Sequence, residues 1–220
     1  FMIELVLYAV GTVFVIFMLV SERAVRAHKT AAAIDPLTGV LNRRGFTEAT
    51  ARVIAREAEA GRPVTVMILD IDHFKSINDR FGHAAGDEVL RRFAGVITER
   101  LRITDHCGRI GGEEFAVLLS CAMDEAMFAA ERVRQAFAAS GIVIGGAEVE
   151  TTVSIGVASG PPGAELDVLL AAADAALYQA KRAGRNRVRS ASDASVPPEQ
   201  GGFAAAGAAS LASRTELQPA

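Results

Sequence analysis

The segment that most constrains the fold places two glycines directly before two acids. It reads Arg109-Ile110-Gly111-Gly112-Glu113-Glu114-Phe115. The apolar run 116–119 follows, and this pattern predicts a β-hairpin with the glycines at its tip. We expect the glycine pair to supply the positive φ angles of a tight turn. A tip with no side chains on one flank and two acids on the other would admit a polyphosphate and its metal, whereas the alternative is an ordinary solvated turn.

A second acidic feature lies at the end of an apolar run. Residues 64–69 are apolar without alternation, which predicts a strand covered on both faces at the centre of a sheet. The run ends in Asp70-Ile71-Asp72, and carboxylates beyond a strand end are a natural position for a metal. The alternative is that both aspartates only terminate the strand.

The remaining periodicities predict further helices and strands around this pair of features. Amphipathic spacing predicts helices over 43–59, 73–81, a stretch after Gly82, 124–139 and 166–182. Residues 143–157 contain two strand-like pieces around Gly145-Gly146 and predict a second hairpin, and Val188 begins a last short strand. The order predicts an α/β (α+β) domain with a central, mainly antiparallel sheet flanked by helices.

The two ends of the chain differ from this domain. Residues 1–20 are almost wholly apolar and long enough to span a bilayer, so we expect a transmembrane helix preceding the domain. Arg23, Arg26 and Lys29 follow, which predicts that this side is cytoplasmic. A cleaved signal peptide and a buried core helix are the weaker alternatives. Residues 21–33 are expected to be a helical linker, and the Ala-, Ser-, Gly- and Pro-rich residues 190–220 a disordered tail. Because the chain begins at Phe1, we expect it to be the end of a longer protein.

Charge and cysteine content narrow the class of protein. The formal net charge is -3 and the pI about 5.9, which argues against a general nucleic-acid surface. Cys107 and Cys121 lack metal-type spacing, so we expect both thiols to pack as small apolar groups in a reduced compartment.

Five motifs in order resemble one family. The Arg-x-Gly-Gly-Glu-Glu-Phe segment resembles the signature of the GGDEF family, the diguanylate cyclases, in its Gly-Gly-Glu-Glu-Phe form. The resemblance covers residues 34–189 and implies the palm-like fold shared with nucleotidyl cyclases and polymerases, with the end of the 64–69 strand beside the Gly111-Gly112 tip. The other four motifs are Asp35-Pro36-Leu37-Thr38-Gly39 with Leu41-Asn42-Arg43-Arg44, residues 70–79, Phe81-Gly82-His83 with Gly86-Asp87, and Ala180-Lys181 with Gly184-Arg185-Asn186.

The resemblance implies a metal site and catalytic residues. Asp70, Glu113 and the carbonyl of Ile71 match the family's ligands for Mg²⁺ (or Mn²⁺), a cation that prefers oxygen ligands. Glu114 occupies the next signature acid and is a candidate for a catalytic role, while Glu113 is the candidate for deprotonating a hydroxyl. Asp72 is left open between a metal role and a structural role.

The resemblance also assigns substrate contacts. Asn78 and Asp87 match guanine-contacting positions, and an amide beside a carboxylate suits guanine's O6 acceptor and its N1 and N2 donors. His83 matches a substrate-contacting position, although a lone histidine is more often a packing or capping residue. Gly111 and Gly112 would let phosphates approach the backbone. Phosphate contacts are implied for Lys75, which with the metal would stabilise charge, and for Lys181 and Arg185.

The implied reaction joins two GTP molecules into cyclic di-GMP and two pyrophosphates, in a homodimer of domains that each hold one GTP. Arg102 and Asp105 match the family's Arg-x-x-Asp product-inhibition motif, with Arg132 or Arg134 as a third contact. The expected location is the inner cell membrane, with the catalytic domain in the cytoplasm and no nucleic-acid partner. The alternatives are a catalytically silent signalling module that binds GTP or cyclic di-GMP, and another purine nucleotide cyclase.

Overall fold

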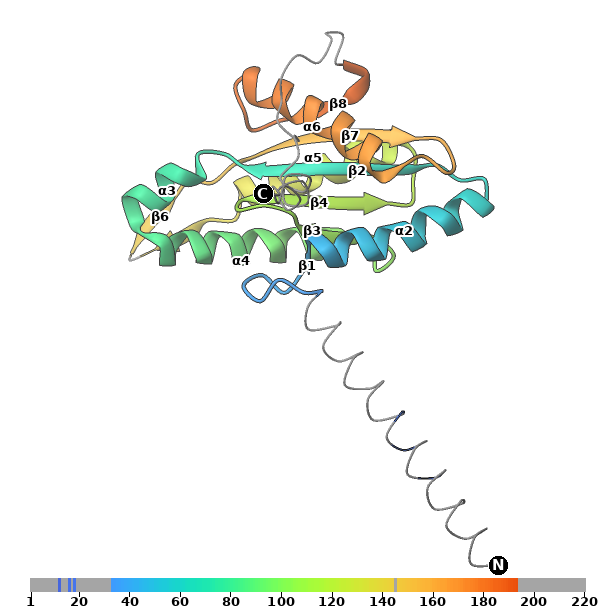
Figure 1. Cartoon of the computed structure of the whole chain (residues 1–220). Helices are drawn as coiled ribbons and strands as arrows, with labels where there is room; N and C mark the ends of the chain where they lie inside the picture. The colour runs from blue at the N-terminus through green and yellow to red at the C-terminus, as the bar shows by residue number, and fades with distance from the viewer. Residues whose placement is uncertain (1–11, 13–15, 17, 19–32, 145, 194–220) are drawn as a thin grey trace, which may run out of the picture.

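The structure, a computed structural model of the chain, describes residues 33–144 and 146–193, together with Thr12, Ile16 and Met18 (Figure 1). The expected membrane span 1–20 (apart from those three residues), nearly all of the linker 21–33 and the tail beyond Asp193 lie outside the described residues. Within the described part, no helix has both the length and the apolar character needed to cross a bilayer.

A six-stranded sheet forms the centre of the domain, in the order β1-β3-β4-β2-β7-β8. The three central pairings, β3 with β4, β4 with β2 and β2 with β7, are antiparallel, while β1–β3 and β7–β8 at the two edges are parallel. The predicted mainly antiparallel sheet is therefore confirmed. The strands are β1 (Leu41–Asn42), β2 (Val64–Ile71), β3 (His106–Arg109), β4 (Glu114–Leu119), β7 (Val153–Gly160) and β8 (Val188–Ser190).

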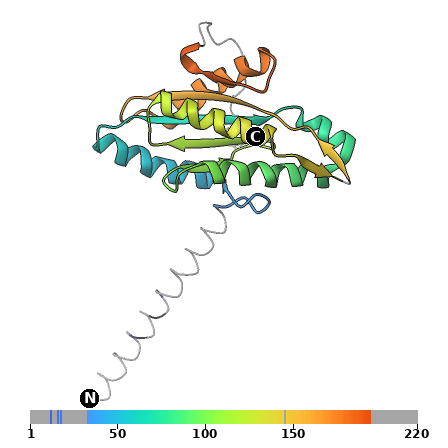
Figure 2. The ribbon, with the colours of Figure 1, turned by 180° about the vertical axis from the view of Figure 1, so that it is seen from behind.

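Helices cover both faces of this sheet (Figures 1 and 2). All eight residues of β2 are buried, and successive side chains point to opposite faces. Val66 and Ile68 pack in a cluster with Phe46 of α2 (Arg43–Glu59) and Leu177 of α6 (Leu166–Arg182). Met67, Leu69 and Ile71 belong to the second cluster, which α3 (Phe74–Phe81), α4 (His83–Arg100) and α5 (Met123–Ala138) cover. The apolar run without alternation thus marks a central strand, as predicted.

The helices begin and end close to their predicted bounds. α2 and α6 have the bounds predicted from the periodicity, and α3 and α5 each begin or end one residue away. Asn42 caps α2, because its side chain accepts a hydrogen bond from the Gly45 amide at 2.9 Å. Cys107 is buried, and its burial raises the pKa of the thiol to about 12, as expected for a packing group.

Two boundaries differ from the prediction. Residues 143–157 were expected to hold one hairpin, but the hairpin β5 (Ile142–Ile144) and β6 (Ala147–Val149) forms a separate small sheet, and a third strand, β7, follows. β7 pairs with β2 along eight residues, so long-range pairing, which no local pattern encodes, makes it central. The predicted start of the tail at residue 190 is also wrong, because Ser190 completes β8 and Ala191–Asp193 forms a 3₁₀ helix against the domain.

Candidate active site

Asp70 lies at the end of β2, next to the two acids of the hairpin. The antiparallel register of β2 and β4 sets Asp70 opposite Glu114, which confirms that the strand end lies beside the glycine-containing tip. Asp70 is only 7% exposed, and its Oδ2 lies 2.8 Å from Nζ of Lys181 on α6. Residues more than 100 positions apart in the chain therefore meet at one point.

The electrostatics of Asp70 show that negative charge gathers here. The pKa of its carboxyl is raised to about 6, mainly by burial and also by the charges of Glu113 and Glu114, while the hydrogen bond and the charge of Lys181 act to lower it. Among the described residues, no group of three or more His, Cys, Asp or Glu side chains is arranged to hold a metal ion. Two carboxylates with a backbone carbonyl and substrate oxygens remain a suitable donor set for Mg²⁺, which commonly takes only one or two protein carboxylates.

The hairpin tip corrects one prediction. Gly111 and Gly112 do not have positive φ angles, so they are not required for the backbone conformation of the turn. Gly111 gives room to the Glu114 side chain, because a Cβ there would lie 2.4 Å from Oε2 of Glu114 and this carboxylate would have to move. A Cβ on Gly112 would have no neighbour within 4 Å, so that side of the tip is open. The main-chain N–H groups of Ile110 and Gly111 both donate to the carbonyl of Glu114 and close the turn.

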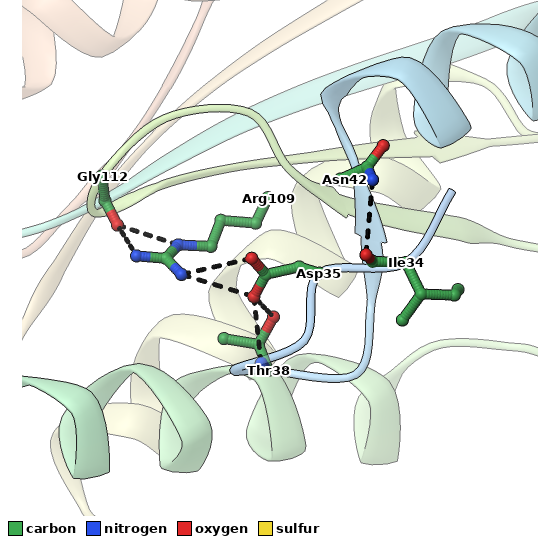
Figure 3. A network of polar contacts seen from close by, with 6 residues as sticks. All are labelled: Ile34, Asp35, Thr38, Asn42, Arg109 and Gly112. Atoms are coloured by element: carbon green, nitrogen blue, oxygen red, sulfur yellow. Dashed lines mark hydrogen bonds and ion pairs between the residues drawn. The ribbon is translucent and has the colours of Figure 1, made fainter. Parts of the chain in front are cut away.

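Arg109 connects the tip to the start of the domain, a role that the sequence motifs did not reveal (Figure 3). Its Nε and Nη2 donate to the carbonyl of Gly112 at 2.9 and 2.7 Å, and its Nη1 lies 3.3 Å from Oδ1 of Asp35. Asp35 also accepts from the backbone and the hydroxyl of Thr38. Although burial acts to raise it, the Thr38 hydrogen bonds and the Arg109 charge hold the pKa of Asp35 below its usual value.

The residues predicted to contact guanine lie on α3 and α4. Asn78 is half-buried on α3, and its Oδ1 lies against Gly86 of α4, where a Cβ would be only 2.0 Å away. Asp87, the next residue, is half-buried, and His83 is exposed at the first position of α4. The structure therefore brings Asn78 to the first turns of α4, beside Asp87. Gly86, which the motif included without a role, is needed for this close approach.

The predicted phosphate-binding cations come from α3, from α6 and from the turn after α6. Lys75 is exposed on α3, and Lys181 contacts Asp70. Arg185 is exposed in the turn after α6 and lines a cavity of about 600 Å³ together with Asp72, His73 and Arg80. The carboxylate of Asp72, whose role the sequence left open, accepts hydrogen bonds from protein groups of β7 and of this turn.

The Arg-x-x-Asp motif lines a separate cavity. Arg102 and Asp105 line a cavity of about 180 Å³ with Arg132 and Phe128 of α5. Asp105 accepts from the Arg102 amide at 2.8 Å, burial raises the pKa of its carboxyl, and the Arg102 guanidinium lies 3.3 Å from Glu125. Arg132 is therefore the arginine that shares this cavity, whereas Arg134 contacts Asn186 elsewhere.

The sequence is similar to those of known proteins. A family model described as "Diguanylate cyclase, GGDEF domain" matches residues 32–187. Diguanylate cyclase DgcP of Pseudomonas aeruginosa is 42% identical over 158 residues, 71% of this chain and 24% of that protein. Response regulator PleD of Caulobacter vibrioides is 42% identical over 161 residues, 71% of this chain and 36% of that protein. The chain thus spans less than half the length of these curated relatives.

Solved structures give the same result. The coiled coil and GGDEF domain of DgcB from Caulobacter crescentus, crystallised in complex with c-di-GMP, superposes with a TM-score of 0.74 at 31% identity. That match covers 84% of this chain and 98% of the other. The active GGEEF domain of a diguanylate cyclase from Vibrio cholerae gives a TM-score of 0.60 at 35% identity, covering 68% and 96% of the two chains.

Proposed function

Because the chain belongs to the GGDEF family of diguanylate cyclase domains, we propose that it condenses two GTP molecules into cyclic di-GMP and releases two pyrophosphates. The observation that carries the proposal is the meeting of Asp70, Lys181 and the two acids of the Gly-Gly-Glu-Glu-Phe tip. The negative charge of a triphosphate must be balanced by cations. Carboxylates beside the phosphates can hold a metal cation there. Relatives that carry the family's domain bear the name diguanylate cyclase.

Asp70, Glu113 and the Ile71 carbonyl would hold Mg²⁺ or Mn²⁺ in this proposal. The cation would neutralise charge on the phosphates during transfer. Lys181, 2.8 Å from Asp70, would donate to a phosphate oxygen, and Lys75 on α3 and Arg185 after α6 would add positive charge. Glu113 would accept the proton of the attacking 3′-hydroxyl, with Glu114 as its neighbour in the signature.

Base selection would follow from the contact between α3 and α4. Asn78 donates and accepts through its amide, and Asp87 accepts, so together they complement the donors and acceptor of guanine. His83, exposed at the start of α4, would contact the substrate from the same side. Adenine lacks the N2 donor and presents a donor in place of O6, so this pair favours GTP over ATP.

Two chains would face each other during the reaction, because each domain binds one GTP and the 3′-hydroxyl of one must reach the α-phosphorus of the other. We further propose that accumulated cyclic di-GMP binds Arg102, Asp105 and Arg132 and slows the enzyme. Three arginines and two carboxylates line this cavity, and such groups suit phosphates and a guanine edge. The membrane proposal rests on the apolar residues 1–20 and the cations after them, which would place the domain at the cytoplasmic face.

The test is an incubation of the purified chain with GTP and Mg²⁺, with nucleotides separated by chromatography. We expect cyclic di-GMP and pyrophosphate, and no product with Glu113→Gln, which removes a charge from the cation site while keeping the side chain's shape. GTP binding without product would instead identify a silent binding module. Tethering is tested by fractionation: the intact chain should sediment with membranes, and a version starting near Ala31 should not.

A further inference from the structure

The turn that carries Arg185 has an unfavourable backbone conformation. Gly184, Arg185 and Asn186 have φ angles of 111°, 62° and 44°, so three consecutive residues lie in the left-handed region. Within the described ranges, the other non-glycine residue with a positive φ is His73, in the loop after β2. Side chains other than glycine disfavour this region, so contacts from outside the turn must stabilise it.

Asp72 supplies one such contact from the end of β2. Its Oδ2 accepts from the main-chain N–H of Asn186 at 3.0 Å and from the hydroxyl of Thr152 at 2.7 Å. Its Oδ1 accepts from the hydroxyl of Ser154 on β7 at 2.7 Å. The side chain is 4% exposed, so its oxygens are directed at protein donors. This arrangement favours a structural role for Asp72 over a metal-binding role, the two alternatives that the sequence left open.

Arg134 supplies a second contact from α5. Its Nη1 donates to the side-chain oxygen of Asn186 at 2.6 Å. Its Nε and Nη2 donate to both carboxylate oxygens of Glu131, which fixes the direction of the guanidinium. Asn186 is therefore held through its main chain by Asp72 and through its side chain by Arg134.

We propose that Asp72 and Arg134 are positioning residues that hold the 184–186 turn, and with it Arg185, in the orientation that binds the phosphates of GTP. The inference rests on the proposed function, because it assigns Arg185 to a phosphate. Arg185 precedes Asn186 and lines the cavity next to His73 and Arg80, so the conformation of Asn186 sets the direction from which the guanidinium approaches. Asp72 acts through hydrogen bonds rather than as a ligand of the cation.

Equilibrium titration of the chain with GTP tests this clamp. Asp72→Ala and Arg134→Ala should each weaken GTP binding about tenfold, since each removes a charge-assisted hydrogen bond. The GTP affinity of Asp72→Asn should stay within about threefold of the parent. The oxygen of the new amide can accept from Asn186 and Thr152, and its NH₂ group can donate to the hydroxyl of Ser154. Matched controls are Asp167→Ala, an exposed acid at the far end of α6, and Arg91→Ala, which also has an i,i+3 ion pair.

A double-mutant cycle with Arg185→Ala shows whether the effect passes through that residue. In the Arg185→Ala background, Asp72→Ala should weaken GTP binding by less than about twofold. Fully additive effects of Asp72→Ala and Arg185→Ala on GTP affinity would overturn the proposal. Equal losses of GTP affinity in Asp72→Asn and Asp72→Ala, together with a raised Mg²⁺ requirement, would also overturn it. The last pattern would make Asp72 a cation ligand. If Asp72→Ala fails to fold, Arg134→Ala carries the same cycle.

Failure of the clamp and failure of the proposed activity give different results. GTP affinity is measured without turnover, so a chain that binds GTP and forms no product would contradict the cyclase assignment while still testing the clamp. Hydrogen exchange at the Asn186 amide adds a readout independent of nucleotide. Asp72→Ala should expose this amide to exchange and Asp167→Ala should not, and unchanged protection in Asp72→Ala would overturn the proposal.

Discussion

Gly156 of β7 lies in close contact with the backbone of helix α6, and Gly156→Ala tests how tightly this contact is packed. A Cβ at this position would lie 2.0 Å from the carbonyl oxygen of Ala173 and 2.3 Å from the amide nitrogen of Leu177. Both atoms belong to the backbone of α6, so no side chain can rotate away. The helix would have to retreat by roughly 1 Å or more before the contact became tolerable.

The expected loss of stability in Gly156→Ala follows from the displacement of the α6 backbone. Overpacking a well-packed core costs about 1–3 kcal/mol, and we expect the upper end of this range because a helix backbone must shift. For a domain of this size, about 3 kcal/mol lowers the Tm by roughly 6–12 °C. The retreat would also lengthen the 2.8 Å contact between Lys181 of α6 and Asp70, so turnover should fall as well.

Urea denaturation followed by circular dichroism measures the change in the free energy of unfolding. Gly95→Ala is the matched control, because a Cβ at Gly95 in the middle of α4 has no neighbour within 4 Å. It should stabilise the domain by about 0.5–1 kcal/mol through helix propensity alone. If Gly156→Ala stayed within about 0.5 kcal/mol of the parent, the packing argument for α6 would be wrong.

Four further predictions concern other parts of the domain. Arg109→Ala and Asp35→Ala should each destabilise it by about 1–3 kcal/mol, with a coupling of about 1 kcal/mol in a double-mutant cycle. Asp87→Ala should weaken GTP binding with little change in Tm, because guanine loses its acceptor, as titration and melting would show. Arg132→Ala should keep initial turnover and abolish product inhibition, measured from progress curves with added cyclic di-GMP. Glu57→Gln should flatten the acid side of the stability profile, because hydrogen bonding by Arg62 lowers the pKa of buried Glu57 to about 2 against the opposing effect of burial.

The sign of the Glu57 effect follows from its lowered pKa. The ionised group contributes its full stability above the unfolded value of 4.5, and this is lost as pH falls towards 2. Urea midpoints measured from pH 6 to pH 2 should therefore fall more steeply in the parent than in Glu57→Gln, and parallel profiles would contradict the assignment. Zero coupling between Asp35 and Arg109, unchanged GTP affinity in Asp87→Ala, or equal inhibition of Arg132→Ala would each refute its prediction.

The local sequence pattern was sufficient to predict the helices, the central strand and the hairpin. The bounds of α2 and α6 follow from helical periodicity, and the full burial of β2 follows from an apolar run without alternation, both of which neighbouring residues encode. The local sequence pattern failed at the glycine pair: a Gly-Gly sequence predicts positive φ, yet neither glycine has it, and the Glu114 carboxylate lies where a Cβ on Gly111 would be. Steric exclusion by a residue three positions away depends on the turn geometry, which composition does not specify.

The sequence by itself determined which residue types are available for a site, and the ordered motifs placed Asp70, the hairpin acids and Lys181 in one family pattern. Only the tertiary structure showed that Arg132 lines the cavity with Arg102 while Arg134 contacts Asn186, since these two arginines lie on one helix and the packing of α5 determines where each side chain lies. The tertiary structure also showed which groups form hydrogen bonds with Asp72 and Arg109. These contacts join segments up to 114 residues apart. A side chain's partner across such a separation is fixed by strand register and helix packing, which arise from the whole chain at once.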